Sequence, residues 1–132
     1  MVVLDTHIFV WWNQQDPKLT SHHFDIIERE RRNGLGICTI SLIEIARLVS
    51  VGRIILPVPI QEWFEISLAQ EGVMLIPITP EIAIDAQSLP RSFHKDPADR
   101  IIVATARISD CSVVTVDKKI LNYPYVKVIP PT

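Results

Sequence analysis

The residues best suited to chemistry are four acids that lie far apart in the sequence. Three of them stand at the end of a short apolar stretch of β-strand composition, or in the turn just beyond it. The fourth lies in the first turn of an apolar helix pattern. The carboxyl ends of parallel strands share one edge of an α/β sheet, where ligands bind, so we expect the four carboxylates to converge there. They are Asp5, Glu44, Asp99 and Asp117.

Four carboxylates at one place repel one another strongly enough to need a counter-charge. Two unit charges about 4 Å apart repel by about 4 kcal/mol at an effective dielectric near 20. The whole stability of a domain is only about 5–15 kcal/mol. Protons must therefore bind, with raised pKa values, or a divalent cation must neutralise the cluster. Oxygen ligands favour Mg²⁺ or Mn²⁺, and no histidine stands at a spacing that indicates zinc.

Each acid also has an alternative role as a helix cap. The segment "SLIE" reads as a capping box with Ser41 as the N-cap. In "DPAD" the proline suits the first helical position, and Asp96 is better interpreted as the N-cap than as a ligand. Asp5 and Asp117 can each cap a short helix that follows them. The two roles are compatible, because a carboxylate at a helix start is held rigidly.

The elements that must position these acids alternate along the chain. Strands alternating with helices predict an α/β fold with a central, mainly parallel sheet of about five short strands, flanked by helices on both faces. We expect strands at 2–4, 36–40, 73–78, 112–116 and 126–130. We expect helices at 6–12, 21–33, 41–52, 61–72, 79–89 and 97–109.

Composition places the chain among globular proteins. The 132 residues, 48% hydrophobic and 21% charged, predict a single domain spanning 1–132. Two cysteines exclude a disulfide scaffold. The amino terminus lacks a basic region, and no apolar run reaches the ~18 residues that span a bilayer, so we expect a cytoplasmic protein without membrane contact. A net charge of −2 argues against nucleic-acid binding by bulk charge, but it allows a local basic groove.

Basic and aromatic residues supply candidate contacts for partners. Trp11 and Trp12 are adjacent and cannot both face one core, so one could reach a dimer or partner surface. His22 and His23 begin a charged helix and are expected to be exposed. The candidates for contact with a phosphate backbone are Arg91, Lys95, Lys118 and Lys119.

Four segments, in this order, resemble the acidic motifs of PIN-domain nucleases: "LDTHIFVWW", "ISLIEIA", "LPRSFHKDPADRIIVATA" and "VVTVDKKI". The resemblance is closest to VapC-type toxins of toxin–antitoxin pairs and runs from Val2 to about Tyr123. It implies an Mg²⁺- or Mn²⁺-dependent endoribonuclease that forms a homodimer and is blocked by a cognate antitoxin protein. It also implies roles for seven residues. Asp5, Glu44, Asp99 and Asp117 match the four acids, Asp96 an additional acid, and Thr6 and Thr115 hydroxyl positions near the metal.

The chemistry expected of this cluster is hydrolysis of RNA phosphodiesters. Asp5 and Asp99 would hold the metal directly, and Glu44 and Asp117 would bind it through water or a second ion. The metal would activate a water for in-line attack, and Glu44 could help to deprotonate that water. Two alternatives remain open. One is a PIN-fold nuclease outside a toxin–antitoxin pair, and the other is a non-catalytic α/β binding module whose acids only cap helices.

Metal titration separates the ligand cluster from the capping-only alternative. We expect Mn²⁺ to raise the thermal unfolding midpoint, because a ligand that binds only the folded state stabilises it by about 2.7 kcal/mol at 100 times its Kd. The measurement is the unfolding midpoint against Mn²⁺ concentration. A midpoint that Mn²⁺ does not move would support the capping-only protein.

Overall fold

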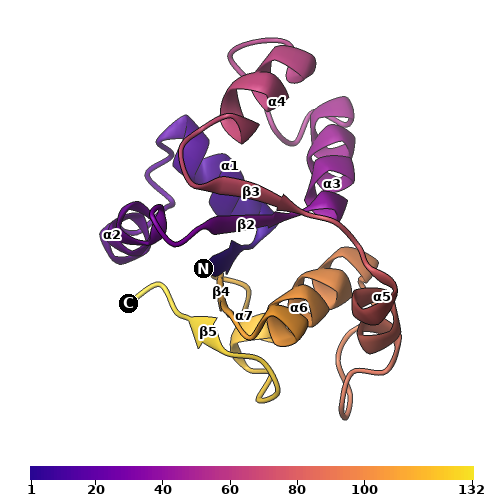
Figure 1. The fold of residues 1–132 in the computed structure, drawn as a ribbon. Helices are drawn as coiled ribbons and strands as arrows, with labels where there is room; N and C mark the ends of the chain where they lie inside the picture. Colours follow the sequence, from indigo (N-terminus) through magenta and orange to yellow (C-terminus); the bar gives the residue numbers. More distant parts are fainter.

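The computed structural model describes all 132 residues and contains one sheet of five short strands (Figure 1). The strand order is β3-β2-β1-β4-β5, and every neighbouring pair is parallel. The expected fold class is therefore confirmed, with a sheet that is parallel throughout. The strands are β1 (Val2–Leu4), β2 (Leu35–Cys38), β3 (Val73–Ile76), β4 (Ser112–Val114) and β5 (Val128–Ile129).

Helices cover both faces of this sheet. In Figure 1, α1, α3 and α4 lie above the strands, and α6 lies below them. Successive residues of β1 enter different cores: Val2 and Leu4 pack in one cluster and Val3 in the other. Strands buried on both faces have continuous apolar sequences, as β1 does. The helices are α1 (Thr6–Gln14), α2 (Ser21–Glu30), α3 (Thr39–Ser50), α4 (Ile60–Leu68), α5 (Pro80–Gln87), α6 (Pro97–Ser109) and α7 (Lys118–Leu121). None of the seven has the length and apolar character to span a bilayer.

Helix α3 begins earlier than its sequence predicts. The helix starts at Thr39, and its N-cap is Cys38, which makes no side-chain capping bond. The predicted capping box with Ser41 as N-cap is therefore wrong. Ser41 is fully buried inside the helix, and its hydroxyl lies 2.8 Å from the hydroxyl of Thr6. Glu44 consequently lies in the second turn of α3 rather than the first.

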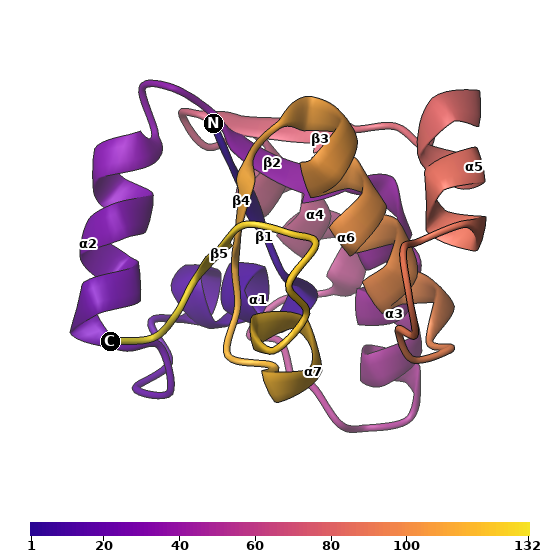
Figure 2. The same ribbon diagram turned by 90° about the horizontal axis from the view of Figure 1, so that it is seen from below.

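Two further expectations need correction. The strand predicted for 112–116 ends at Val114, so Asp117 does not end a strand. Asp117 follows Thr115 by two residues and is the N-cap of α7. His23, expected to be exposed, is fully buried. Its Nε2 lies 2.8 Å from the carbonyl oxygen of Ile129 in the carboxyl-terminal segment, which runs beside α2 (Figure 2). A buried backbone carbonyl in that segment requires a hydrogen-bond partner. The hydrogen bond that His23 supplies offsets the hydration that its imidazole loses on burial.

The turn before β3 gives a prediction about stability. Gly72 has φ +88°, and a Cβ there would collide with the backbone of Arg31, 2.9 Å from its Cα. We expect Gly72→Ala to lower the free energy of unfolding by about 2–4 kcal/mol, because strain and a backbone clash add. Gly52→Ala is the matched control: its φ is +77° but the space around it is open, so the cost should be only about 1 kcal/mol. Chemical denaturation measures both, and equal losses would contradict the clash.

Candidate active site

A cleft of about 780 Å³ brings the predicted acids together. It lies where β1 and β4 end. At this point the strand order reverses, because the chain leads from β1 to β2 on one side of β1 and later to β4 on the other side. Ligand crevices of open parallel sheets form at such switch points. The predicted acids reach it from the starts of α1, α6 and α7 and from the second turn of α3. They are Asp5, Glu44, Asp96, Asp99 and Asp117, and a sixth acid, Asp16, lines the cleft from the loop after α1.

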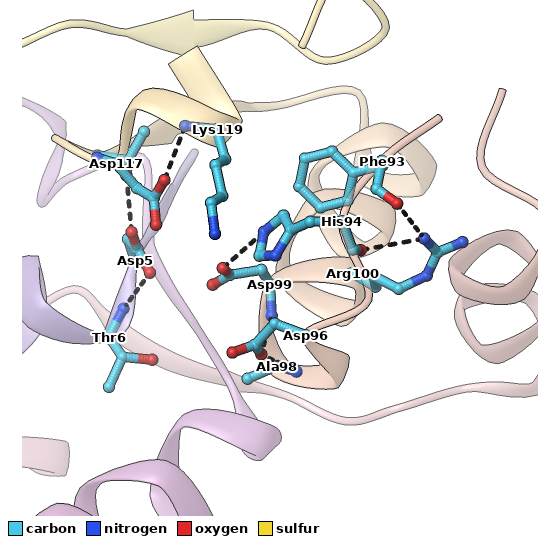
Figure 3. A network of polar contacts seen from close by, with 11 residues as sticks. Asp5, Thr6, Phe93, His94, Asp96, Ala98, Asp99, Arg100, Asp117 and Lys119 are labelled. Carbon is cyan, nitrogen blue, oxygen red and sulfur yellow. Dashed lines mark hydrogen bonds and ion pairs between the residues drawn. The ribbon is translucent and has the colours of Figure 1, made fainter. Parts of the chain in front are cut away.

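Asp5 is held at the bottom of this cleft by two hydrogen bonds. The backbone N–H of Thr6 donates to its Oδ1 at 2.8 Å, and the hydroxyl of Thr115 donates to its Oδ2 at 2.6 Å. Asp5 is only 7% exposed, and this burial raises the pKa of its carboxyl above the usual value although both hydrogen bonds oppose the shift. The hydroxyl of Thr115 also accepts the backbone N–H of Asp117 at 3.0 Å (Figure 3). Thr115 therefore couples the ends of β1 and β4.

The hydroxyl of Thr6, unlike that of Thr115, makes no hydrogen bond to an acid of the cleft. Thr6 is buried, and its Oγ1 is paired with Ser41 of α3 rather than directed into the cleft. The pair joins the start of α1 to the first turns of α3. Thr6 contributes to the site through its backbone N–H, which fixes Asp5, and through the placement of the helix that carries Glu44.

The carboxyl of Asp99 is also strongly perturbed. Burial raises its pKa to about 7, and the negative charges of Asp5, Asp96, Asp117 and Glu44 add to the effect. Each of these four acids therefore lies close enough to Asp99 to interact with it. A carboxyl with this pKa carries a proton near neutral pH unless a cation replaces it.

His94 lies directly against this carboxyl. Its Nε2 is 2.9 Å from Asp99 Oδ2, within ion-pair distance but outside the direction of a hydrogen bond. Arg100 fixes the loop that carries His94, because its guanidinium donates to the carbonyl oxygens of Phe93 and His94 at 3.0 and 3.2 Å, and to that of Ala86 (Figure 3). This contact places His94 beside the acids.

Helix capping accounts for only part of the acidic cluster. Asp5, Asp96 and Asp117 each accept a backbone N–H at the start of α1, α6 or α7. Glu44 makes no hydrogen bond or ion pair and lines the cleft half-buried. Asp99 lies in the first turn of α6 but caps nothing. The capping-only alternative therefore does not account for Glu44 and Asp99, because neither of them caps a helix.

The predicted phosphate contacts are not among the residues that line the cleft. Arg91 lies apart from it, where its Nε donates to the hydroxyl of Tyr125 at 3.0 Å. Lys95 and Lys118 are exposed, and neither forms an ion pair. Lys119 is also exposed, and its side chain extends toward His94 and Asp99 (Figure 3).

Three other cations line the cleft. The sequence did not identify them as candidates for contact with phosphate. Arg47 follows Glu44 by one turn of α3, but the two form no ion pair. Lys18 and Arg53 lie in the loops after α1 and α3. No local pattern distinguishes these loop cations from ordinary surface charges.

The pKa of Asp99 predicts how stability depends on pH without metal. Its pKa is raised from 3.8 to about 7, so the folded state holds a proton that the unfolded state has released, and stability is lost as pH rises from about 4 through 7. We expect Asp99→Asn to be more stable than the wild type at pH 8 in EDTA, by about 1–2 kcal/mol, and equal to it near pH 4. Denaturant unfolding at both pH values tests this.

The control for this measurement is Asp25→Asn, a change at an exposed acid of α2 outside the cleft. It should keep the wild-type loss of stability at pH 8. If Asp99→Asn lost as much stability between pH 4 and 8 as the wild type, the raised pKa would be contradicted.

Comparisons with known proteins agree with this arrangement. Residues 2–124 match the PIN domain family. Ribonuclease VapC22 of Mycobacterium tuberculosis is 37% identical over 122 residues, which is 92% of this chain and 91% of that protein.

Two solved structures show the same fold at lower identity. VapBC2 from Rickettsia felis, bound to a DNA fragment from its promoter, has a TM-score of 0.75 at 19% identity and covers 98% of both chains. A toxin–antitoxin complex from Klebsiella pneumoniae has a TM-score of 0.64 at 17% identity, and the match covers 100% of this chain and 98% of the other. The expected family is confirmed: the chain belongs to the PIN-domain family, as a protein of the VapC type.

Proposed function

We propose that this protein is a divalent-metal-dependent endoribonuclease and the toxin of a type II toxin–antitoxin pair. The observation that carries the proposal is the cleft that gathers five carboxylates from four parts of the chain. Burial there, together with the negative charges of the other four acids, raises the pKa of Asp99 to about 7. Membership of the VapC type, and the relative named as a ribonuclease, support RNA as the substrate.

The donor set of the cleft fits a hard divalent cation. All candidate ligands are carboxylate oxygens, which suit Mg²⁺ or Mn²⁺. No three His, Cys, Asp or Glu side chains already surround a single point. Mg²⁺ does not need such a cage, because it keeps several of its waters and is usually bound through one or two carboxylates. Asp5 and Asp99 are the direct ligands in this proposal, and Glu44 and Asp117 act through water or a second ion.

Each residue of the cleft then has a defined task. A bound Mg²⁺ or Mn²⁺ lowers the pKa of a coordinated water and stabilises charge on the phosphoryl oxygens. Thr115 orients Asp5 by its 2.6 Å hydrogen bond. Glu44, which has no partner in the fold, accepts the proton of the attacking water at its carboxylate. Attack at phosphorus breaks the bond to the 3′-oxygen and leaves a 5′-phosphate and a 3′-hydroxyl.

Phosphate contacts outside the cleft belong to the same proposal. Lys118 and Lys119 follow Asp117 directly, and both are exposed. Lys119 already extends toward Asp99 (Figure 3). Lys95 and Arg91 lie on the loop before α6 and extend the proposed contact along the RNA backbone.

Protein partners complete the proposal. The VapBC2 and Klebsiella pneumoniae structures are of toxin–antitoxin systems, which supports a cognate antitoxin for this chain. Exposed apolar side chains on α3, β3 and α5 support a homodimer: Ile43 is 67% exposed, Leu75 44% and Ile84 69%. We place the pair in the cytoplasm, where RNA is available.

Charge removal at the two direct ligands tests the activity. Asp5→Asn and Asp99→Asn should each lower Mg²⁺-dependent cleavage of RNA by about 100-fold or more, because each removes an anionic metal ligand while keeping nearly the same shape. Asparagine is also a good N-cap, so α1 should persist in Asp5→Asn. Cleavage is followed on gels with added Mg²⁺.

Asp25→Asn serves as the control for charge alone and should cleave as the wild type does. Thermal unfolding of all variants confirms that they fold. Unchanged cleavage by Asp5→Asn or Asp99→Asn would remove that residue from the metal site.

A further inference from the structure

The wall of the cleft that carries its cations has no role in metal binding. It is formed by α1 and the loop after it, which also carries Asp16, and by the end of α3 and the loop after α3. Its side chains are cationic, aromatic and aliphatic rather than only acidic. Those used below are His7, Trp11, Lys18, Arg47 and Arg53.

Trp11 differs from the other two tryptophans of the chain. Trp12 and Trp63 are buried, and their indole N–H groups donate to Glu28 and Gln14. Trp11 is half-buried and lines the cleft, and its indole N–H makes no hydrogen bond within the protein. A large aromatic ring that faces a polar cleft is available to a ligand with a flat face of its own.

Charged and aromatic groups surround this indole. Lys18 Nζ lies 6.0 Å from the ring centroid, and the His7 ring lies 6.0 Å away at an angle of 55°. An aromatic platform next to a flexible cation is the arrangement by which proteins hold single-stranded nucleic acid, since the ring stacks on a base and the cation meets a phosphate.

The cations of this wall are not paired with any acid of the protein. Lys18, Arg47 and Arg53 form no ion pair and no side-chain hydrogen bond, although carboxylates line the same cleft. In contrast, Arg100 and Arg107 are fully engaged with the fold. Unpaired cations beside an acidic site provide the phosphate attraction that the acids cannot.

We propose that Trp11 is a base-stacking platform that holds an unpaired nucleotide next to the cleaved phosphodiester, with Arg53 and Lys18 on the flanking phosphates. This proposal rests on the proposed ribonuclease function and adds a specificity-determining residue to it. A base inside a duplex is already stacked on both faces and cannot reach the indole. The cleft therefore selects single-stranded or looped RNA.

Binding without cleavage tests the platform. The probe is a fluorescein-labelled, single-stranded oligoribonucleotide of mixed sequence, with the wild-type protein in EDTA so that no hydrolysis occurs. Trp11→Ala should weaken binding by roughly 5-fold or more, the loss expected from one base–aromatic stack. Trp11→Phe should restore most of the affinity, because phenylalanine also stacks. Anisotropy of the probe gives the Kd.

The tryptophan fluorescence of the protein, measured with unlabelled RNA, distinguishes a stacking role of Trp11 from a purely structural one. RNA should quench the emission of the wild type, because a base on Trp11 contacts the one tryptophan that lines the cleft. The quenching should disappear in Trp11→Phe, while binding persists. The same strand annealed to its complement should bind more weakly and quench less.

Salt dependence tests the cations separately. Arg53→Ala should lower the slope of log K against log salt by about 0.7, the value for one phosphate contact on a single strand. Arg29→Ala removes the same charge from an exposed position of α2 outside the cleft and should leave the slope unchanged.

The outcomes separate this proposal from the activity itself. If Trp11→Ala binds the single strand as tightly as the wild type, the platform is overturned. If that variant also fails to bind its antitoxin, Trp11 is an antitoxin contact and not a platform for RNA. Equal binding and quenching by the duplex would overturn it as well. If the wild type binds and quenches but does not cleave with Mn²⁺, the platform is supported and the proposed endoribonuclease activity is contradicted.

Discussion

The structure depends on holding like charges together at the carboxyl edge of a parallel sheet. Burial raises the pKa of Asp5, and burial with the charges of its neighbours raises that of Asp99 to about 7. Such a group opposes folding until protons or a cation neutralise it. The opposition is tolerated because two apolar cores, one on each face of the sheet, anchor the elements that carry the acids. A cation that completes the site therefore also completes the stability of the fold.

The fold reaches this arrangement by using helix starts for two purposes. In a parallel α/β sheet, each strand leads at its carboxyl end into the amino terminus of the next helix, where unpaired N–H groups and the helix dipole favour negative charge. Asp5, Asp96 and Asp117 satisfy such groups and still line the cleft. Capping fixes the direction of each of these three carboxylates. Glu44 is the exception, because it lies in the second turn of α3 and caps nothing. Its carboxylate is therefore the one that the fold leaves free for the role of proton acceptor proposed above.

The sequence predicted features that depend on local pattern and not those that depend on distant contacts. Continuous apolar strands and helix-start acids identified the parallel sheet and the convergence of Asp5, Glu44, Asp99 and Asp117 without coordinates. The start of α3 was misplaced because the partner that draws Ser41 inward, Thr6, is 35 residues away. His23 was assigned to the surface because the carbonyl that it meets lies 106 residues further along the chain. The cations of the cleft were overlooked because an unpaired charge is defined by its three-dimensional neighbours.

A chain of net charge −2 can bind a polyanion only if its charges are kept apart. Had Arg47 or Arg53 paired with a carboxylate of the cleft, each charge would have cancelled the other. No such pair forms, so the acids and the cations of the cleft each keep their own field. In the proposed nuclease, a cation that neutralises the acids would remove the repulsion that RNA meets at the sheet edge, and so would favour RNA binding. By reciprocity, bound RNA would favour the cation equally. The separation of charge within one cleft would then be the physical cause of cooperative assembly at the proposed site.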